Sequence, residues 1–174
     1  CFVEPTGAPP AVCMATVATA GASSAAASSD PFPGPLDRTT DKQVLLDYAE
    51  RMTREEIRKW PDGTYRFTDY VDDDGFTDEP LPISVAITVH GDCVTVDYEG
   101  SASQVPAALN STKSYTNSCT YLSVRCVLKG DIPNNAGVFR AIDVKAPEAS
   151  LVNPKLPAAV AARALTGYRI VDAM

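Results

Sequence analysis

The sequence has little of what metal and redox sites need. Its 174 residues include a single histidine, His90, and five cysteines, an odd number with no C-x-x-C pair. That spacing excludes a local zinc site of the usual kind. Cys119 and Cys126 lie seven residues apart, which places them on one face of a helix. We expect both in the core as small apolar side chains, because a reactive thiol needs an electropositive, accessible setting.

Nucleotide-binding and nucleophile motifs are also missing. The chain has no P-loop and no G-x-G-x-x-G, so it carries no sign of a self-contained nucleotide site. It has neither G-x-S-x-G nor S-x-x-K, which argues against a serine nucleophile.

Long apolar runs and basic segments are absent as well. No run approaches the roughly 18 apolar residues that a membrane span needs, and residues 1–37 contain no Lys or Arg to begin a signal peptide. The net charge of -7 and the pI near 4.6 argue against nucleic acid and against an anionic membrane surface. We therefore predict a cytoplasmic protein with no nucleic-acid or membrane partner.

The composition divides the chain into two regions. Residues 1–38 are rich in Ala, Ser, Pro, Thr and Gly, as in GASSAAASSDPFPGP, and are too poor in large apolar groups to offset chain entropy. We predict disorder there and a partial domain over residues 39–174. The chain starts at Cys1 and stops at Met174 inside what resembles a continuing helix. We therefore expect a fragment of a larger subunit.

Hydrophobic periodicity predicts the elements of the first half. Spacings of three and four predict a helix over residues 40–60, with its apolar face formed by Val44, Leu45, Tyr48, Ala49 and Met52. Alternation then predicts a half-buried strand over residues 65–71. Alternation on both sides of Gly91-Asp92 predicts a β-hairpin with a two-residue turn over residues 81–99.

The second half returns to mixed periodicity. A stripe of Tyr115, Cys119, Leu122 and Cys126 predicts a helix over residues 113–129, and residues 138–146 are typical of a strand. An alanine-rich helix is predicted from Pro157 to Leu165, closed by Gly167. This succession predicts an α+β fold in which antiparallel hairpins pack against helices.

Acidic residues gather at the end of the first predicted strand and in the acidic loop that follows it (residues 72–79). They are Asp69, Asp72, Asp73, Asp74, Asp78 and Glu79. Hard oxygen ligands of this kind can hold Mg²⁺ or Mn²⁺, but the spacing fails for a calcium loop, and we favour a solvated acidic turn. We assign no metal ligand. His90 directly precedes the hairpin turn, and we expect it to be exposed rather than catalytic.

Four polar side chains are the candidates for substrate binding. Amide and guanidinium groups that converge on a polar substrate are most often carried by loops, and the candidates on or beside loops are Asn110, Asn134, Asn135 and Arg163. An alternative stays open, because Asn supplies turn dihedrals and Arg can pair with an acid or a carbonyl. No catalytic residue is assigned.

Four segments carry a resemblance to a known family: PDGTYRFTDYVDDDG, VDYEGSASQVPAALNST, DIPNNAGVFR and SLVNPKLPAAVAARALTGYRIVDAM. In this order they resemble the hydantoinase B and 5-oxoprolinase family, over residues 45–174. The resemblance implies a segment of an ATP-dependent cyclic amide hydrolase that opens 5-oxoproline or hydantoin rings. It also implies a hydantoinase A-type partner and ATP with Mg²⁺, bound mainly outside these residues.

Two alternatives accompany this expectation. Acetone and acetophenone carboxylases resemble the same family more distantly, so a carboxylase-type subunit is one alternative. The other makes these residues scaffold and subunit interface, with the catalytic groups elsewhere in the complex.

Overall fold

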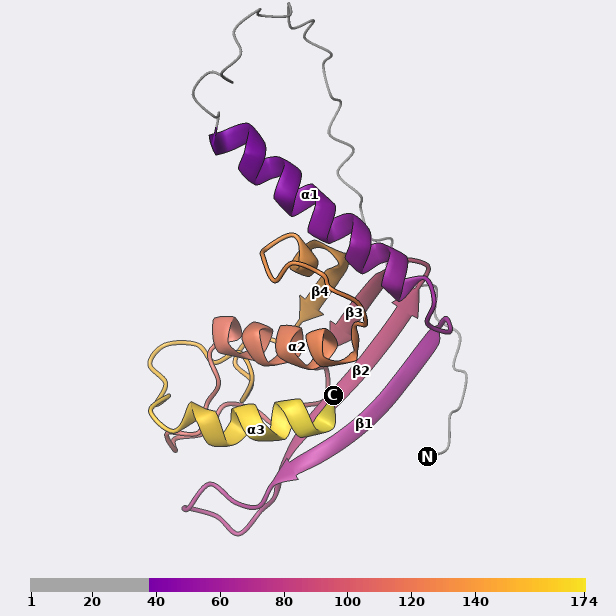
Figure 1. The fold of residues 1–174 in the computed structure, drawn as a ribbon. Helices are drawn as coiled ribbons and strands as arrows, with labels where there is room; N and C mark the ends of the chain where they lie inside the picture. The colour runs from indigo at the N-terminus through magenta and orange to yellow at the C-terminus, as the bar shows by residue number, and fades with distance from the viewer. Residues whose placement is uncertain (1–37) are drawn as a thin grey trace, which may run out of the picture.

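The computed structural model describes residues 38–174, so the predicted disorder of the N-terminal segment lies, apart from Arg38, outside the described residues. Figure 1 shows two helices packed on one face of a sheet and a third helix across its end. In chain order the elements, with η1 a 3-10 helix, are α1 (Arg38–Ile57), β1 (Gly63–Val71), β2 (Leu81–His90), β3 (Cys93–Asp97), α2 (Lys113–Val127), η1 (Val138–Ala141), β4 (Ile142–Lys145) and α3 (Arg163–Ala173).

The four strands form one mixed sheet in the order β1-β2-β3-β4. The β1–β2 and β2–β3 pairs are antiparallel, whereas β3 and β4 are parallel and are connected through α2. A parallel pair needs such a crossover connection, and a helix commonly supplies it. Among the described residues, no helix is long and apolar enough to cross a membrane. The α+β prediction is confirmed.

The predicted hairpin is confirmed in detail. His90 pairs with Cys93, so that Gly91 and Asp92 form a two-residue turn. Gly91 has a φ of 59°, a conformation that glycine adopts without the steric cost met by other residues. The turn is tied to the rest of the molecule, because the Asp92 carboxylate accepts from Arg58 at 2.6 Å and from Arg54 at 3.2 Å, both on α1 or directly after it.

The core lies between the sheet and the helices α2 and α3. Strand residues alternate into it, and Ile83, Val96 and Tyr98 have no exposed surface. The Tyr98 hydroxyl lies 2.6 Å from Thr120 Oγ1 of α2, so this polar group is satisfied inside the core. Burial raises the pKa of Tyr98 to about 12, so the phenol stays neutral at ordinary pH.

Two predicted apolar faces are correct only in part, because Ala49 on α1 and Cys119 on α2 are buried as predicted but other members are not. On α1, Val44, Leu45 and Tyr48 are exposed, because the first half of the helix extends beyond the sheet (Figure 1). On α2 the predicted stripe is rotated away from the buried face, so Cys119 is buried but Cys126 is exposed.

The buried face of α2 contains two threonines that hydropathy does not identify. Thr116 donates to the Val152 carbonyl at 2.7 Å, and Thr120 bonds to Tyr98. Burying a hydroxyl costs little free energy when it is hydrogen-bonded. The two threonines can therefore occupy the inner face of α2, on which Leu122 was predicted to lie.

The final helix begins later than predicted and passes through Gly167. Backbone groups of residues 157–162 are used by another segment: the Ala159 carbonyl accepts from the Asn110 side chain and the Ala162 N–H donates to Ala108. These backbone groups are therefore not available for the hydrogen bonds of an α-helix. Gly167 is inside α3, where a Cβ would come within 2.5 Å of a Tyr115 ring atom, so the glycine allows α2 and α3 to pack closely.

The predicted strand over residues 138–146 is correct only in its second half. Residues Val138–Ala141 form η1, and the strand β4 is limited to Ile142–Lys145. The start of η1 packs on α1, where a Cβ on Gly137 would come 2.0 Å from the Leu46 carbonyl oxygen.

Candidate functional site

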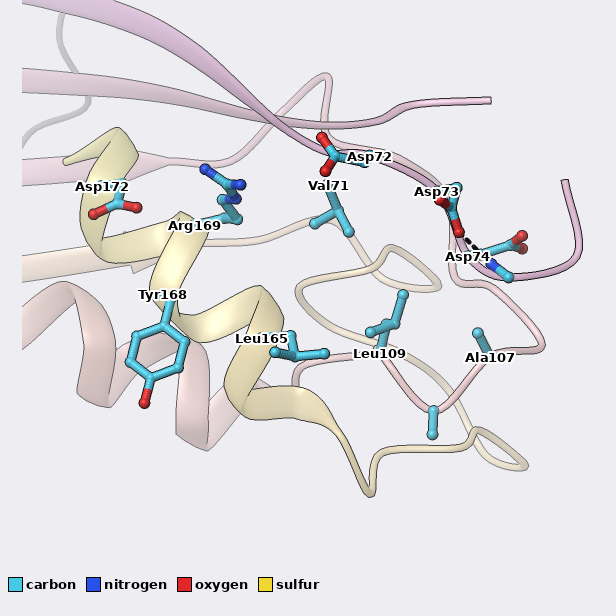
Figure 2. Close-up of a pocket in the computed structure, with 12 residues that line it drawn as sticks. Val71, Asp72, Asp73, Asp74, Ala107, Leu109, Leu165, Tyr168, Arg169 and Asp172 are labelled. Atoms are coloured by element: carbon cyan, nitrogen blue, oxygen red, sulfur yellow. Dashed lines mark hydrogen bonds between the residues drawn. The ribbon is translucent and has the colours of Figure 1, made fainter. Parts of the chain in front are cut away.

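A cleft of about 740 Å³, called the main cleft below, lies between the acidic loop, residues 107–109 and the outer face of α3 (Figure 2). Its walls come from segments that are about a hundred residues apart in the chain. The residues that line it are Val71, Asp72, Asp73, Asp74, Gly75, Ala107, Ala108, Leu109, Leu165, Tyr168, Arg169 and Asp172.

The acidic loop is held by its own carboxylates. Asp73 accepts from the Gly75 N–H at 2.8 Å, and Asp74 accepts from the N–H groups of Phe76 and Thr77 at 2.9 and 2.8 Å. These backbone hydrogen bonds, of which the one from Phe76 has the largest effect, hold the pKa of Asp74 below its usual value. Within the described residues, no group of three or more His, Cys, Asp or Glu side chains is placed to hold a metal ion. The carboxylates that form these bonds stabilise a turn.

The opposite wall is the outer face of α3. Arg169 forms an ion pair with Asp69 of β1, at 3.7 Å between Nη1 and Oδ2. Figure 2 shows Tyr168 and Arg169 leaving α3 in opposite directions, Arg169 toward β1. Leu165 and Tyr168 are exposed, so the wall combines apolar surface with one cation.

The charge of the cleft is negative. Four carboxylates line it, from Asp72, Asp73, Asp74 and Asp172, against one guanidinium, from Arg169. A surface of one sign repels ligands of that sign and attracts the opposite sign. The cleft therefore suits a cationic or neutral polar group better than a polyphosphate.

Asn110 is not on the wall of this cleft but behind it. Its side chain has no exposed surface. Oδ1 accepts from the Val105 N–H at 2.9 Å, and Nδ2 donates to the carbonyls of Val105, Ala107 and Ala159 at 2.7, 3.0 and 2.9 Å. Both ends of the amide are therefore engaged by backbone groups, and the side chain ties residues 105–110 to the segment before α3.

Asn134 and Asn135 lie in the loop before η1. The Asn135 side chain accepts from the Gly137 N–H at 2.8 Å and donates to the Leu45 carbonyl of α1 at 3.3 Å. It stabilises the close contact between η1 and α1. Asn134 is exposed.

Arg163 is the first residue of α3 and is exposed. Its guanidinium lies 5.5 Å from the centre of the Tyr115 ring and donates to the Val160 carbonyl at 3.2 Å. The cation–π contact connects α3 to α2.

The four predicted substrate contacts do not converge. Asn135 lies against α1, whereas Asn110 and Arg163 lie beside α3, and in Figure 1 α2 separates α1 from α3. None of the four lines the main cleft. Substrate binding by these residues stays a prediction.

Sequence reasoning missed the α3 wall of the cleft. Tyr168, Arg169 and Asp172 follow Gly167, where the predicted helix was closed. The spacing of Ile170 and Ala173, both buried, was the signal that the helix continues. The predicted exposure of His90 is confirmed: its side chain is 64% exposed, and Nδ1 lies 3.9 Å from an Asp62 oxygen.

Comparison with known proteins gives a consistent set of relatives. The family model described as Hydantoinase B/oxoprolinase matches residues 40–174. The B component of a putative D-/L-hydantoinase of Pseudomonas sp. (strain NS671) is 36% identical over 143 residues, which are 76% of this chain and 24% of that protein.

Solved structures agree with this similarity. The crystal structure of the ATP-dependent caprolactamase from Pseudomonas jessenii matches with a TM-score of 0.69 at 29% identity, over 79% of this chain and 24% of that one. A nucleotide-free acetone carboxylase matches with a TM-score of 0.57 at 17% identity, over 68% of this chain and 17% of that one, which is a likeness of fold. The chain spans about a quarter of the length of the hydantoinase and caprolactamase relatives.

Proposed function

Because this chain belongs to the hydantoinase B/oxoprolinase family, we propose that it is part of a subunit of an ATP-dependent cyclic amide hydrolase. The finer proposal is a cytoplasmic enzyme that opens 5-oxoproline or hydantoin rings together with a hydantoinase A-type subunit. The observation that carries it is the family match over residues 40–174. Relatives named as a hydantoinase and as an ATP-dependent caprolactamase support the same reaction class.

ATP does not fit the main cleft by charge, and among the described residues no group of three or more His, Cys, Asp or Glu side chains is placed to hold Mg²⁺. A nucleoside triphosphate brings negative charge to a wall that already holds four carboxylates and one guanidinium. The carboxylates of Asp73 and Asp74 already accept backbone N–H groups of their own turn. We therefore place the nucleotide outside these residues, where ATP would activate the amide by phosphorylation.

The geometry favours a positioning role for the buried part of the chain. The Asn110 amide is used by four backbone contacts, so its contribution to catalysis would come through the loops that it holds. Asn134 and Arg163 are exposed and keep groups that can reach a substrate or a partner. Substrate contact at Asn110, Asn134, Asn135 and Arg163 is retained as the proposal to be tested.

The scaffold alternative has a specific observation in its favour. Val44 and Leu45 on α1 are 60% and 57% exposed, in a helix whose first half stands clear of the sheet (Figure 1). Apolar surface of this kind marks interaction sites. Under this alternative the chain contributes interface and the catalytic groups lie elsewhere in the complex.

The reaction class is tested on the subunit that carries this chain, combined with a hydantoinase A-type subunit. ADP release is measured with 5-oxoproline or hydantoin, and in parallel with acetone and labelled bicarbonate. ADP release together with a ring-opened product supports the proposal. Incorporation of bicarbonate without ring opening contradicts it and supports the carboxylase-type alternative.

Alanine substitutions then separate substrate handling from scaffold. N134A and R163A are expected to lower turnover and leave assembly intact if these side chains contact substrate. V44A tests the scaffold alternative, because it removes exposed apolar surface from α1. Under that alternative it is expected to weaken assembly and to leave turnover per assembled complex unchanged. Loss of assembly with R163A, at unchanged turnover per assembled complex, would support the scaffold alternative.

A further inference from the structure

The strand β1 is at the margin of the sheet and is long for an edge strand. It pairs with β2 over nine residues, from Gly63 with Val89 to Val71 with Leu81. Its other edge faces no strand of the described residues, as Figure 1 shows. An edge of this kind is a template for pairing with another chain.

The hairpin register determines which backbone groups of β1 point outward. The pair of His90 and Cys93, which closes the two-residue turn, exchanges both of its backbone hydrogen bonds. Even-numbered residues of β2 therefore bond toward β3. Ser84 agrees, because its N–H and carbonyl both meet Ser101 Oγ on that side, at 3.1 and 3.2 Å. Odd-numbered residues of β2 bond toward β1.

The odd-numbered residues of β2 pair with odd-numbered residues of β1. The N–H and carbonyl groups of the even-numbered residues of β1 consequently point away from the sheet. None of these residues is proline, so all four offer a donor and an acceptor. They are Thr64, Arg66, Thr68 and Tyr70.

This edge is complementary to itself. If two copies of β1 pair antiparallel about Phe67, Thr64 of one copy faces Tyr70 of the other, and Arg66 faces Thr68. Every outward backbone group then has a partner. Phe67 meets its own copy at the two-fold axis, in the kind of pair where side chains approach most closely.

The side chains favour the same register. Phe67 and Tyr70 are 54% and 48% exposed, and aromatic cross-strand pairs stabilise antiparallel strands. No like charges face each other, because Arg66 faces Thr68 and Asp69 faces Tyr65. Proline and charged side chains, lysine above all, usually protect an edge strand from pairing with another chain. This edge has no proline and only one basic side chain, so that protection is weak.

We propose that the open edge of β1 binds β1 of a second copy of this chain, which joins two sheets into one of eight strands about a two-fold axis at Phe67. The proposal concerns the surface of the chain and does not depend on the enzymatic reaction. It predicts a symmetric dimer, since the same patch is used on both copies.

The test is the mass in solution of the purified subunit that carries this chain, by sedimentation velocity over a range of concentrations. The wild type is expected at twice its monomer mass. Thr68→Pro removes one outward N–H and obstructs the edge, while the β1–β2 ladder keeps its hydrogen bonds. It is expected to raise the dimer dissociation constant about tenfold or more. Thr68→Val keeps the N–H and is the matched control, with dimerisation unchanged.

Cross-linking tests the register. In F67C the two introduced thiols lie across the two-fold axis, and mild oxidation is expected to give a disulfide-linked dimer that mass spectrometry locates at position 67. A wild-type chain that stays monomeric at all concentrations overturns the proposal. A dimer that persists unchanged in Thr68→Pro overturns the assignment to this edge, and so does a dimer without the F67C cross-link. Circular dichroism verifies that each variant is folded.

Discussion

Replacement of Asn110 by alanine tests the structural role of the buried amide. The side chain accepts one backbone N–H and donates to three carbonyls at 2.7–3.0 Å, with no exposed surface. Alanine leaves these groups without their partner. Each buried polar group without a partner costs about 1–3 kcal/mol. We expect a loss of about 2–4 kcal/mol in the free energy of unfolding, since water can enter the vacated space and satisfy some of the groups.

Urea unfolding, followed by circular dichroism, measures this loss. With a slope of about 1.5 kcal/mol per molar urea, the midpoint falls by about 1.3–2.7 M. Asn110→Asp has the same shape but places a carboxylate oxygen against carbonyl oxygens, so we expect it to destabilise the chain as well. N134A is the control, because an exposed side chain of this kind changes stability by about 0.5 kcal/mol or less.

The outcome separates two roles of Asn110. If N110A unfolds within about 0.5 kcal/mol of the wild type, a difference typical of surface substitutions, the reasoning from the hydrogen bonds is refuted. A subunit with N110A that keeps full stability but loses turnover would instead identify the amide as a substrate contact.

Three further predictions follow from the packing and the charges. G137A is expected to lower the melting temperature more than G167A, because the added Cβ meets a backbone carbonyl oxygen at 2.0 Å in the first and a movable tyrosine ring atom at 2.5 Å in the second. T120V leaves the buried Tyr98 hydroxyl without its partner and should cost about 1–3 kcal/mol in urea unfolding, while the double variant with Y98F should recover part of that loss. Burial raises the pKa of Asp92, but the Cys93 thiol and two guanidinium groups outweigh it, and the folded pKa lies below normal. Stability from Asp92 is therefore present above about pH 4 and is lost as the pH falls through the lowered value. Acid unfolding between about pH 5 and pH 2, the range where carboxylates protonate, should cost the wild type more than D92N, and an equal loss would contradict this assignment.

Alternation and turn chemistry were sufficient for the hairpin. The apolar side chains alternate on both sides of Gly91-Asp92, and glycine is the residue that the first turn position requires. The pattern is local, so nothing distant could override it. The α+β class followed from the same kind of local signal.

Burial on the helices was harder to predict because polar residues can be buried when they are bonded. Thr116 and Thr120 face the core through hydrogen bonds to Val152 and Tyr98, residues that are 36 and 22 positions away. The apolar Leu122 is 55% exposed on the outer face. A hydropathy scale gives each residue a value of its own and takes no account of such distant hydrogen-bond partners.

The candidate site shows the same limit. The acidic loop was visible in the sequence as a run of aspartates, and its solvated, turn-forming character could be inferred from it. Its neighbour across the cleft, the face of α3 with Tyr168 and Arg169, was not visible. Asn110 was selected for a possible ligand, but its partners are backbone groups that only the tertiary fold brings to it.

The sequence by itself determined the hairpin, the helices α1 and α2, the acidic balance and the family resemblance, because each depends on local order along the chain. The tertiary structure decided which faces are buried, where α3 begins, and that the acidic loop meets α3 across a cleft. Those features depend on contacts between distant segments, such as Asn110 with Ala159 and Arg169 with Asp69. Packing and hydrogen bonding between such segments exist only in the folded chain.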